Sequence, residues 1–227
     1  MCAPVRLSEA PQRLAQNRTL LIVLILNLLW TASLFLVPFT LPPGEAAGLD
    51  GNANLVDNYG HYTSYPPYQQ AIYVLGDFQC HQMGARSMWF NGNQMPIDAR
   101  MTSMYVFASF GILTAIFARP TPWLSEGVTG VLPRRLRVPL RARLGNVWTA
   151  VLLLGLAVVP VAIDGFYQLL TPYESTNLTR VLTGIPSGWA GGLFLGMMFV
   201  SLQQFEKQRQ EALRSALAEV PRRVETQ

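Results

Sequence analysis

Four stretches of this sequence contain no charged residue and are long enough to cross a membrane. They span 19–44, 101–118, 144–163 and 181–205. A membrane-crossing helix needs about 20 mostly apolar residues, and the hydrocarbon core offers no water to unpaired backbone amides. Only 13% of the residues are charged, compared with about a quarter in soluble domains. We therefore expect an all-α integral membrane protein.

The sequence predicts a single membrane domain over 1–227, built as a bundle of four transmembrane helices. We place these helices at about 20–37, 102–118, 147–163 and 185–202. Pro38 is expected to end the first of them. An outer loop with a short interfacial helix at 69–82 occupies 39–101, and an Arg-rich cytoplasmic loop occupies 119–146. A cytoplasmic leader, 1–18, precedes the first span, and a helical cytoplasmic tail, 204–227, follows the last. Because the leader is polar and the first span is long, we do not expect a cleaved signal peptide.

The basic residues predict the orientation. All but three of the 17 Lys and Arg residues lie in the leader, in 119–146 or in the tail, and the exceptions are Arg86, Arg100 and Arg180. Basic residues accumulate on the cytoplasmic side, so both termini are predicted to be cytoplasmic, in a prokaryotic inner membrane. Cys2 and Cys80 then lie on opposite sides and cannot pair. The net charge of +4 follows from this topology, and we expect no nucleic-acid partner.

The fourth span carries a glycine at every fourth position, at Gly184, Gly188, Gly192 and Gly196. Small residues at this spacing share one helix face and allow close approach of another membrane helix. That helix belongs either to this chain or to a partner subunit, and the sequence leaves both open. In the first span, Asn27 is predicted to form a hydrogen bond between helices.

An unusual polar motif, Cys80–His81, lies in the outer segment. A thiolate and an imidazole are ligands for zinc, iron or copper. The downstream stretch 91–102 adds only Asp98 and the thioethers of two methionines, which makes a poor closed metal site. The alternative is structural: Cys80 is a small buried hydrophobe and His81 forms a hydrogen bond.

A second polar group lies at the outer ends of spans three and four. Arg180 is a natural partner for Asp164 or Glu174, and the segment 175–177 can cap a helix. Either these residues lock the loop 164–184 over the bundle, or they form a small polar pocket. The complete predicted outer-face cluster comprises Cys80, His81, Gln82, Arg86, Gln94, Asp98, Arg100, Asp164, Gln168, Glu174, Asn177 and Arg180.

These motifs resemble an uncharacterised prokaryotic family of small membrane proteins known as a domain of unknown function. Its pattern runs Cys-His-Gln, Arg-Ser, then a Gly, Gln and Pro stretch ending Cys-x-Arg-Cys-Thr, and later Asp-Gly, Gln and Ser-Thr-Asn before Arg and Thr-Gly. The first block matches at Cys80, His81, Gln82, Arg86, Ser87, Gly92, Gln94, Pro96, Ala99, Arg100, Thr102 and Tyr105. The second matches at Asp164, Gly165, Gln168, Ser175, Thr176, Asn177, Arg180, Thr183 and Gly184.

This chain departs from the family pattern at two positions. Asp98 and Met101 stand where the pattern has cysteines. The resemblance implies a site of four metal ligands or a redox dithiol in the family. In this chain, that chemistry has lost two ligands.

We therefore expect a non-catalytic accessory subunit of a large membrane complex, in contact with other membrane subunits and lipids. An energy-converting electron-transport complex, of respiratory complex I, photosynthetic or quinol-oxidising type, is the assembly considered first. One alternative is a membrane enzyme or metal- or redox-binding protein, with a site built from Cys80, His81, Asp98, Arg100, Asp164 and Arg180. Another is a lipid- or quinone-binding module, for which bound lipid or quinone would be the cofactor.

Overall fold

The computed structural model of the chain describes residue 14 and residues 17–224, with side chains as far as 217. Most of the predicted leader, 1–18, and the last three residues of the tail therefore lie outside the described residues. The fold is mostly helical, and four of its helices are long and apolar enough to cross a membrane. They are α2 (Arg18–Leu36), α5 (Ala99–Phe117), α7 (Arg134–Leu170) and α8 (Asn177–Val224).

Shorter elements connect these helices. The segment after α2 forms a 3₁₀ turn, η2 (Val37–Thr40), at Pro38, where a proline was predicted to end the helix. Further along the chain come α3 (Tyr59–Tyr62), α4 (Pro67–Gln79), the antiparallel strands β1 (Ser87–Phe90) and β2 (Asn93–Asp98), and, between α5 and α7, α6 (Leu124–Gly130). The interfacial helix predicted at 69–82 thus corresponds to α4.

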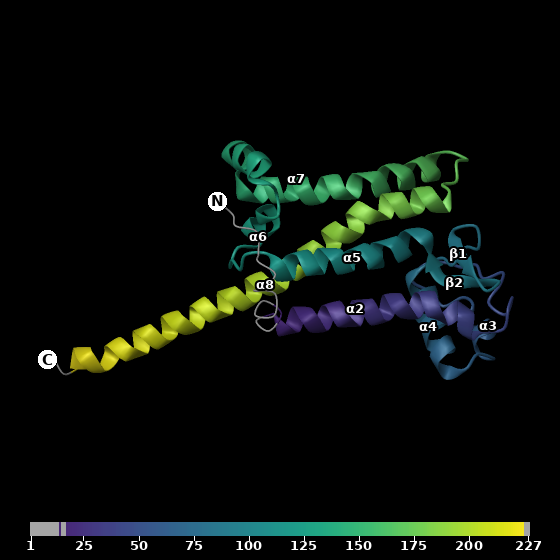
Figure 1. The fold of residues 1–227 in the computed structure, drawn as a ribbon, viewed down its shortest axis with the longest axis horizontal. Coiled ribbons are helices and arrows are strands. Elements are labelled where there is room, and N and C mark those ends of the chain that lie inside the picture. The colour runs from purple at the N-terminus through teal and green to yellow at the C-terminus, as the bar shows by residue number, and fades with distance from the viewer. Residues whose placement is uncertain (1–13, 15–16, 225–227) are drawn as a thin grey trace.

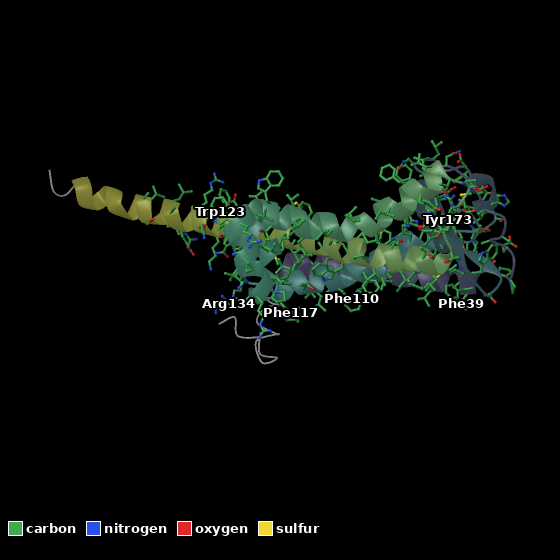
Figure 2. All side chains as sticks on the ribbon, turned by 90° about the horizontal axis from the view of Figure 1, so that it is seen from above. Phe39, Phe110, Phe117, Trp123, Arg134 and Tyr173 are labelled. Carbon is green, nitrogen blue, oxygen red and sulfur yellow. The ribbon has the colours of Figure 1, made fainter. Side chains whose placement is uncertain are left out.

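The bundle has α5 and α8 at its centre. In Figure 1, α2 lies beside α5, and α7 lies on the other side, against α8. A cap made of residues 37–98, with α3, α4 and the two strands, covers one end of α2 and α5. At the opposite end are α6 and the start of α7, and there α8 continues well beyond the other helices. Figure 2 shows the same polarity, with Phe39 and Tyr173 at the cap end and Trp123 and Arg134 at the other.

Two apolar cores stabilise the two ends. The cap core includes Tyr62, Tyr73, Met95 and Ile97, all of them completely buried, packed over Leu34 of α2. The second core joins α2, α5, α6 and α8 at the opposite end. Between the two cores, Asn27 of α2 donates to Ser109 Oγ at 2.8 Å and to the carbonyl of Tyr105 at 2.9 Å, both in α5. This is the predicted hydrogen bond between helices.

The four glycines of α8 lie against α5. A Cβ at Gly188 would lie 2.5 Å from the carbonyl oxygen of Met104, and Cβ atoms at Gly184, Gly192 and Gly196 would also collide with α5. The glycine face was expected to pack either against a helix of this chain or against a partner subunit, and the structure shows it packed against α5 of this chain.

Three elements differ from the sequence prediction. The hairpin β1–β2 corrects the all-α expectation for 39–101. The Arg-rich segment 119–146, predicted as a loop, contains α6 and the first turns of α7. The predicted loop 164–184 is helical except for 171–176, because α7 continues to Leu170 and α8 begins at Asn177. Charge-free windows locate the part of a helix that can cross a membrane, but they do not mark where the helix itself ends or where a short hairpin forms.

The close approach of α5 and α8 is tested by two neighbouring substitutions. Gly188→Ala places a methyl group against the backbone of Met104, and we expect it to destabilise the fold by roughly 1–3 kcal/mol. Gly191→Ala adds the same group where nothing lies within 4 Å, so it should be neutral or slightly stabilising, since alanine favours a helix. Thermal unfolding of both variants in detergent measures the difference, and equal midpoints would contradict the packing described.

Candidate functional site

An ion pair joins α5 to α7 just beneath the cap. Arg100 lies in the first turn of α5, and its Nη2 donates to Oδ2 of Asp164, which projects from α7 one and a half turns before the end of that helix. The pair is largely buried, with exposed fractions of 14% for the arginine side chain and 7% for the carboxylate. Gln168, one turn further along α7, donates to the same carboxylate oxygen at 2.9 Å. A buried charge is thereby both paired and hydrogen-bonded, as burial requires.

Arg180 extends this network from α7 to α8. Its Nη2 donates to Oε1 of Gln168 at 2.7 Å, and its Nε donates to the carbonyl of Ser175 at 3.2 Å. The hydroxyl of Ser175 accepts a hydrogen bond from Gln168 at 2.8 Å. Thr176 caps α8, since its hydroxyl accepts from the amide of Thr179 at 3.2 Å. The connection between α7 and α8 is therefore held by polar contacts on both helices.

The network reaches the cap through two contacts. Arg86, which precedes β1, donates from Nε to Oε1 of Glu174 at 2.8 Å. Asn177, at the start of α8, donates to the carbonyl of Ser87 at 3.0 Å. The Arg86 guanidinium lowers the pKa of the exposed Glu174 carboxyl below its usual value, and Arg180 adds to this effect. These contacts fix the cap to the ends of α7 and α8.

Cys80 and Asp98 meet inside the cap. The Cys80 Sγ lies 3.3 Å from the backbone nitrogen of Asp98, which points toward it. Asp98 is the N-cap of α5, and its Oδ1 accepts from the amide of Met101 at 2.6 Å. Positions 80, 98 and 101 are thus neighbours in space. The Asp98 carboxylate itself caps the N-terminus of α5.

The thiol of Cys80 is protected from solvent. Only 3% of the residue is exposed, and burial, together with the charge of Asp98, raises its pKa to about 11. Reactive cysteines have a lowered pKa and an accessible thiolate. Cys80 has the opposite properties, which match its alternative interpretation as a small buried hydrophobe.

His81 points away from this group. Its Nδ1 accepts a hydrogen bond from the amide of Ala53 at 3.1 Å, in the loop before α3. Within the described part of the chain, no three His, Cys, Asp or Glu side chains are close enough together to hold a metal ion. The two adjacent residues of the Cys-His motif therefore serve different parts of the cap.

Gln82 and Gln94 form a second buried polar group, which organises the cap. Gln82 adopts a left-handed backbone conformation (φ 47). Its side chain donates to the carbonyls of Pro96, at 2.8 Å, and Tyr73, and accepts from the hydroxyl of Tyr62 at 2.5 Å. Gln94 donates to the carbonyl of Gln82. Both glutamines are fully buried and join α4 to β2.

Sequence reasoning missed several residues of the cap. Asn93 donates to the carbonyl of Pro38 at 2.8 Å and accepts from the amide of Ala46 at 2.9 Å, so it ties β2 to the segment after α2. A signal for its surroundings was present, because Asn91-Gly92 is the pair that favours a type I′ hairpin turn. Both residues have the positive φ that this turn requires, 53 and 71.

The structure divides the predicted outer-face cluster into three parts. One network at the helix ends contains Arg86, Arg100, Asp164, Gln168, Glu174, Asn177 and Arg180. A second group within the cap contains Cys80, Gln82, Gln94 and Asp98, and His81 stands apart from both. Of the six residues of the enzyme hypothesis, Cys80 contacts Asp98, and Arg100 contacts Asp164, which Gln168 links to Arg180. Asp98 and Arg100 are two residues apart at the start of α5, whereas His81 contacts Ala53.

Comparison with protein families identifies the wider relationship. The model of the family described as "Predicted membrane protein (DUF2085)" matches residues 80–194, the segment that contains both polar groups. This match covers half of the chain. The chain belongs to this family.

Two archaeal relatives, both uncharacterised proteins, are similar over much of their length. One, from Methanocaldococcus jannaschii, is 26% identical over 182 residues, which are 80% of this chain and 93% of the relative. The other, from Methanothermobacter thermautotrophicus, is 30% identical over 109 residues, which are 48% of this chain and 77% of the relative. No solved structure matches the chain. The segment shared with the family contains α5, α7 and the first part of α8.

Two carboxylate-to-amide substitutions compare the buried and exposed ion pairs. Asp164→Asn leaves the Arg100 charge buried without its counter-ion, and we expect a loss of roughly 3 kcal/mol in stability. Glu174→Gln removes an exposed carboxylate that solvent screens, so its effect should be much smaller. Thermal unfolding in detergent measures both variants. If Glu174→Gln were the more damaging change, the buried pair would not be the main link.

The environment of Cys80 predicts slow alkylation. In a Cys2→Ser variant at pH 8, Cys80 of the folded protein should react with iodoacetamide at least about a hundredfold more slowly than Cys80 of the unfolded chain. The reason is that the pKa of the folded thiol, about 11, lies two units above the ordinary 9.0, so the reactive thiolate is rarer. The same shift makes the free energy of unfolding depend on pH, because the folded state holds the Cys80 proton more tightly than the unfolded state. The stabilisation from the protonated thiol is complete below pH 9 and is lost as the pH rises from 9 to 11. Rapid labelling of the folded protein would contradict the buried position.

Proposed function

We propose that this protein is a non-catalytic accessory subunit of a larger membrane assembly. In this proposal the helical bundle is the anchor, and residues 203–224 of α8, called here the α8 arm, dock against a partner subunit. The observation that carries the proposal is the position of the arm, which leaves the bundle as a single helix (Figure 1). From 203 to 217 every side chain except that of Gln204 is exposed.

An isolated helix of this length is marginal in water unless it packs against something. The α8 arm also exposes three large apolar side chains. Phe205, Leu213 and Leu217 are each more than half exposed, and their spacing places them within one third of the helix circumference. Glu206 and Arg209, which pair with each other, lie in the same third, and the other charged and amide side chains occupy the rest. This pattern fits a helix that lies with its apolar side in a groove of another protein.

The polar groups of the cap and the helix ends support a non-catalytic role. Arg100 of α5 binds Asp164 of α7, and Arg180 of α8 binds Gln168 of α7, which in turn binds Asp164. The buried Cys80 thiol has a raised pKa, so it is a poor nucleophile and a poor metal ligand at neutral pH. These features favour an interlocked structural cap over the alternative of an outer-face enzyme or metal site.

The orientation belongs to the same proposal. The Arg-rich first turns of α7 and the α8 arm lie at the end opposite the cap (Figure 1), and an excess of Lys and Arg favours the cytoplasmic side. The arm would therefore meet its partner in the cytoplasm. An energy-converting electron-transport complex remains the assembly proposed first, and the haem or flavin absorbance of such a complex would be detectable in the purified material.

The proposal predicts that the apolar side of the α8 arm retains the partner. A Phe205→Glu/Leu213→Glu/Leu217→Glu variant should stay in the membrane but lose at least about nine-tenths of the co-purifying chains. The matched control, Gln204→Glu/Gln208→Glu/Ser215→Glu, introduces the same three negative charges on the opposite side and should retain them. Mild-detergent purification from native membranes, followed by mass spectrometry of the stoichiometric chains, measures both.

Two outcomes would contradict the accessory role. One is wild-type protein that migrates only as a small free species after mild solubilisation. The other is a stoichiometric partner that both variants retain equally, which would place the contact elsewhere than the α8 arm.

A further inference from the structure

We infer that the first turns of α7 form a binding surface for the phosphate headgroup of an anionic phospholipid. This basic segment, residues 134–144, reads Arg-Arg-Leu-Arg-Val-Pro-Leu-Arg-Ala-Arg-Leu. It lies at the end of the bundle opposite the cap, where Figure 2 labels Arg134. The inference does not depend on the proposed accessory role, since it concerns lipid rather than a protein partner.

A backbone break separates the basic segment from the membrane span. Gly145 has φ 75 and ψ 174, which is not helical, and it kinks α7. Only glycine adopts this conformation readily. Charged residues end at Arg143, and the uncharged stretch of α7 begins directly after it. The kink thus falls where the chain changes from headgroup-type to hydrocarbon-type sequence, and the basic segment need not follow the direction of the span.

Two of the five arginines hold the basic segment against α6. Arg141 donates through Nε to the hydroxyl of Thr129 at 2.9 Å and through Nη2 to the carbonyl of Glu126 at 3.1 Å. Arg137 donates to the carbonyl of Gly130, the last residue of α6, at 3.2 Å. Cations at the C-terminal end of a helix interact favourably with its carbonyls. The segment is therefore fixed in place on one side.

Among the residues that the structure describes, the other three arginines of the basic segment form no hydrogen bond with α6. Arg134, Arg135 and Arg143 are exposed, and within the described residues none of them makes a hydrogen bond or ion pair. Arg134 lies three residues before Arg137, and like charges at this helical spacing cost free energy unless anions are nearby. A guanidinium presents paired donors that match a phosphate group. The unpaired side of the segment therefore suits phosphate ligands.

The apolar side chains indicate that the phosphate belongs to a lipid. Leu136, Leu140 and Leu144 recur at every fourth position and share one side of the segment, and the first and last of them are about half exposed. An interfacial helix buries such a stripe at the boundary with the acyl chains and keeps its arginines among the headgroups. Trp148, one turn after the kink, and Trp123, before α6, are both 66% exposed, as is typical of tryptophans at the membrane interface.

Titration of the purified full-length protein with phospholipid tests the inference. Native mass spectrometry in detergent should give an apparent dissociation constant for phosphatidylglycerol at least about tenfold lower than for phosphatidylcholine. In an Arg134→Gln/Arg135→Gln/Arg143→Gln variant, this preference should fall to less than about threefold, because each arginine near an anionic surface contributes roughly a fivefold factor.

Two further variants serve as controls. Lys207→Gln/Arg209→Gln/Arg214→Gln removes the same number of charges from the α8 arm and should keep the preference. The triple Arg→Lys variant of the basic segment should keep most of it, and it provides a folded comparison if the Gln variant loses stability. Competition with inorganic phosphate distinguishes a lipid headgroup from a free anion.

Specific outcomes would overturn the inference. These are equal affinity of the wild type for the two lipids, an unchanged preference in the Gln variant of the basic segment, or an equal loss in the α8-arm control. Complete displacement of phosphatidylglycerol by millimolar inorganic phosphate would assign the arginines to a free anion instead of a lipid.

Discussion

The close contact between α5 and α8 is the constraint on which the rest of the structure depends. Membrane helices gain little from the hydrophobic effect against one another, so their association relies on close van der Waals packing. The glycines of α8 let its backbone approach that of α5 at Met104 and along the whole face. Because this contact sets the relative height of the two helices, it also fixes where their first turns, with Arg100 and Arg180, lie beneath the cap.

The polar network then converts that helix pair into a larger unit. Arg100 on α5 and Arg180 on α8 reach Asp164 and Gln168 on α7, a helix that packs mainly against α8 and α6. Apolar side chains of α7 gain little by leaving lipid. The buried ion pair between Arg100 and Asp164 therefore supplies the directional contact that positions the end of α7 next to the cap. The cost of burying charge explains why Asp164 and Arg180 each have more than one partner.

The sequence was sufficient for the spans and insufficient for the cap. Uncharged windows and proline 38 predict α2 and α5 well, because exclusion of charge from the bilayer is a local property of sequence. The cap depends on long-range contacts, such as those of Gln82 with Pro96 and Asn93 with Pro38, which no periodicity reveals. Asp164 was expected beyond a helix end, yet it lies within α7, because a paired carboxylate does not require the helix to stop. The functional site stays a prediction for the same reason: its residues came from motifs, and the contacts separate them.

The two ends of the bundle use arginine in opposite ways. At the cap end, Arg86, Arg100 and Arg180 each have an acidic partner, and the largely buried positions of the last two make an external anion unnecessary. At the other end, Arg137 and Arg141 cap α6, while Arg134, Arg135 and Arg143 face outward without partners among the described residues. Exposed guanidinium groups without a protein partner remain free to bind anions outside the fold. The asymmetry is therefore the structural basis for the proposed headgroup contact at the end opposite the cap.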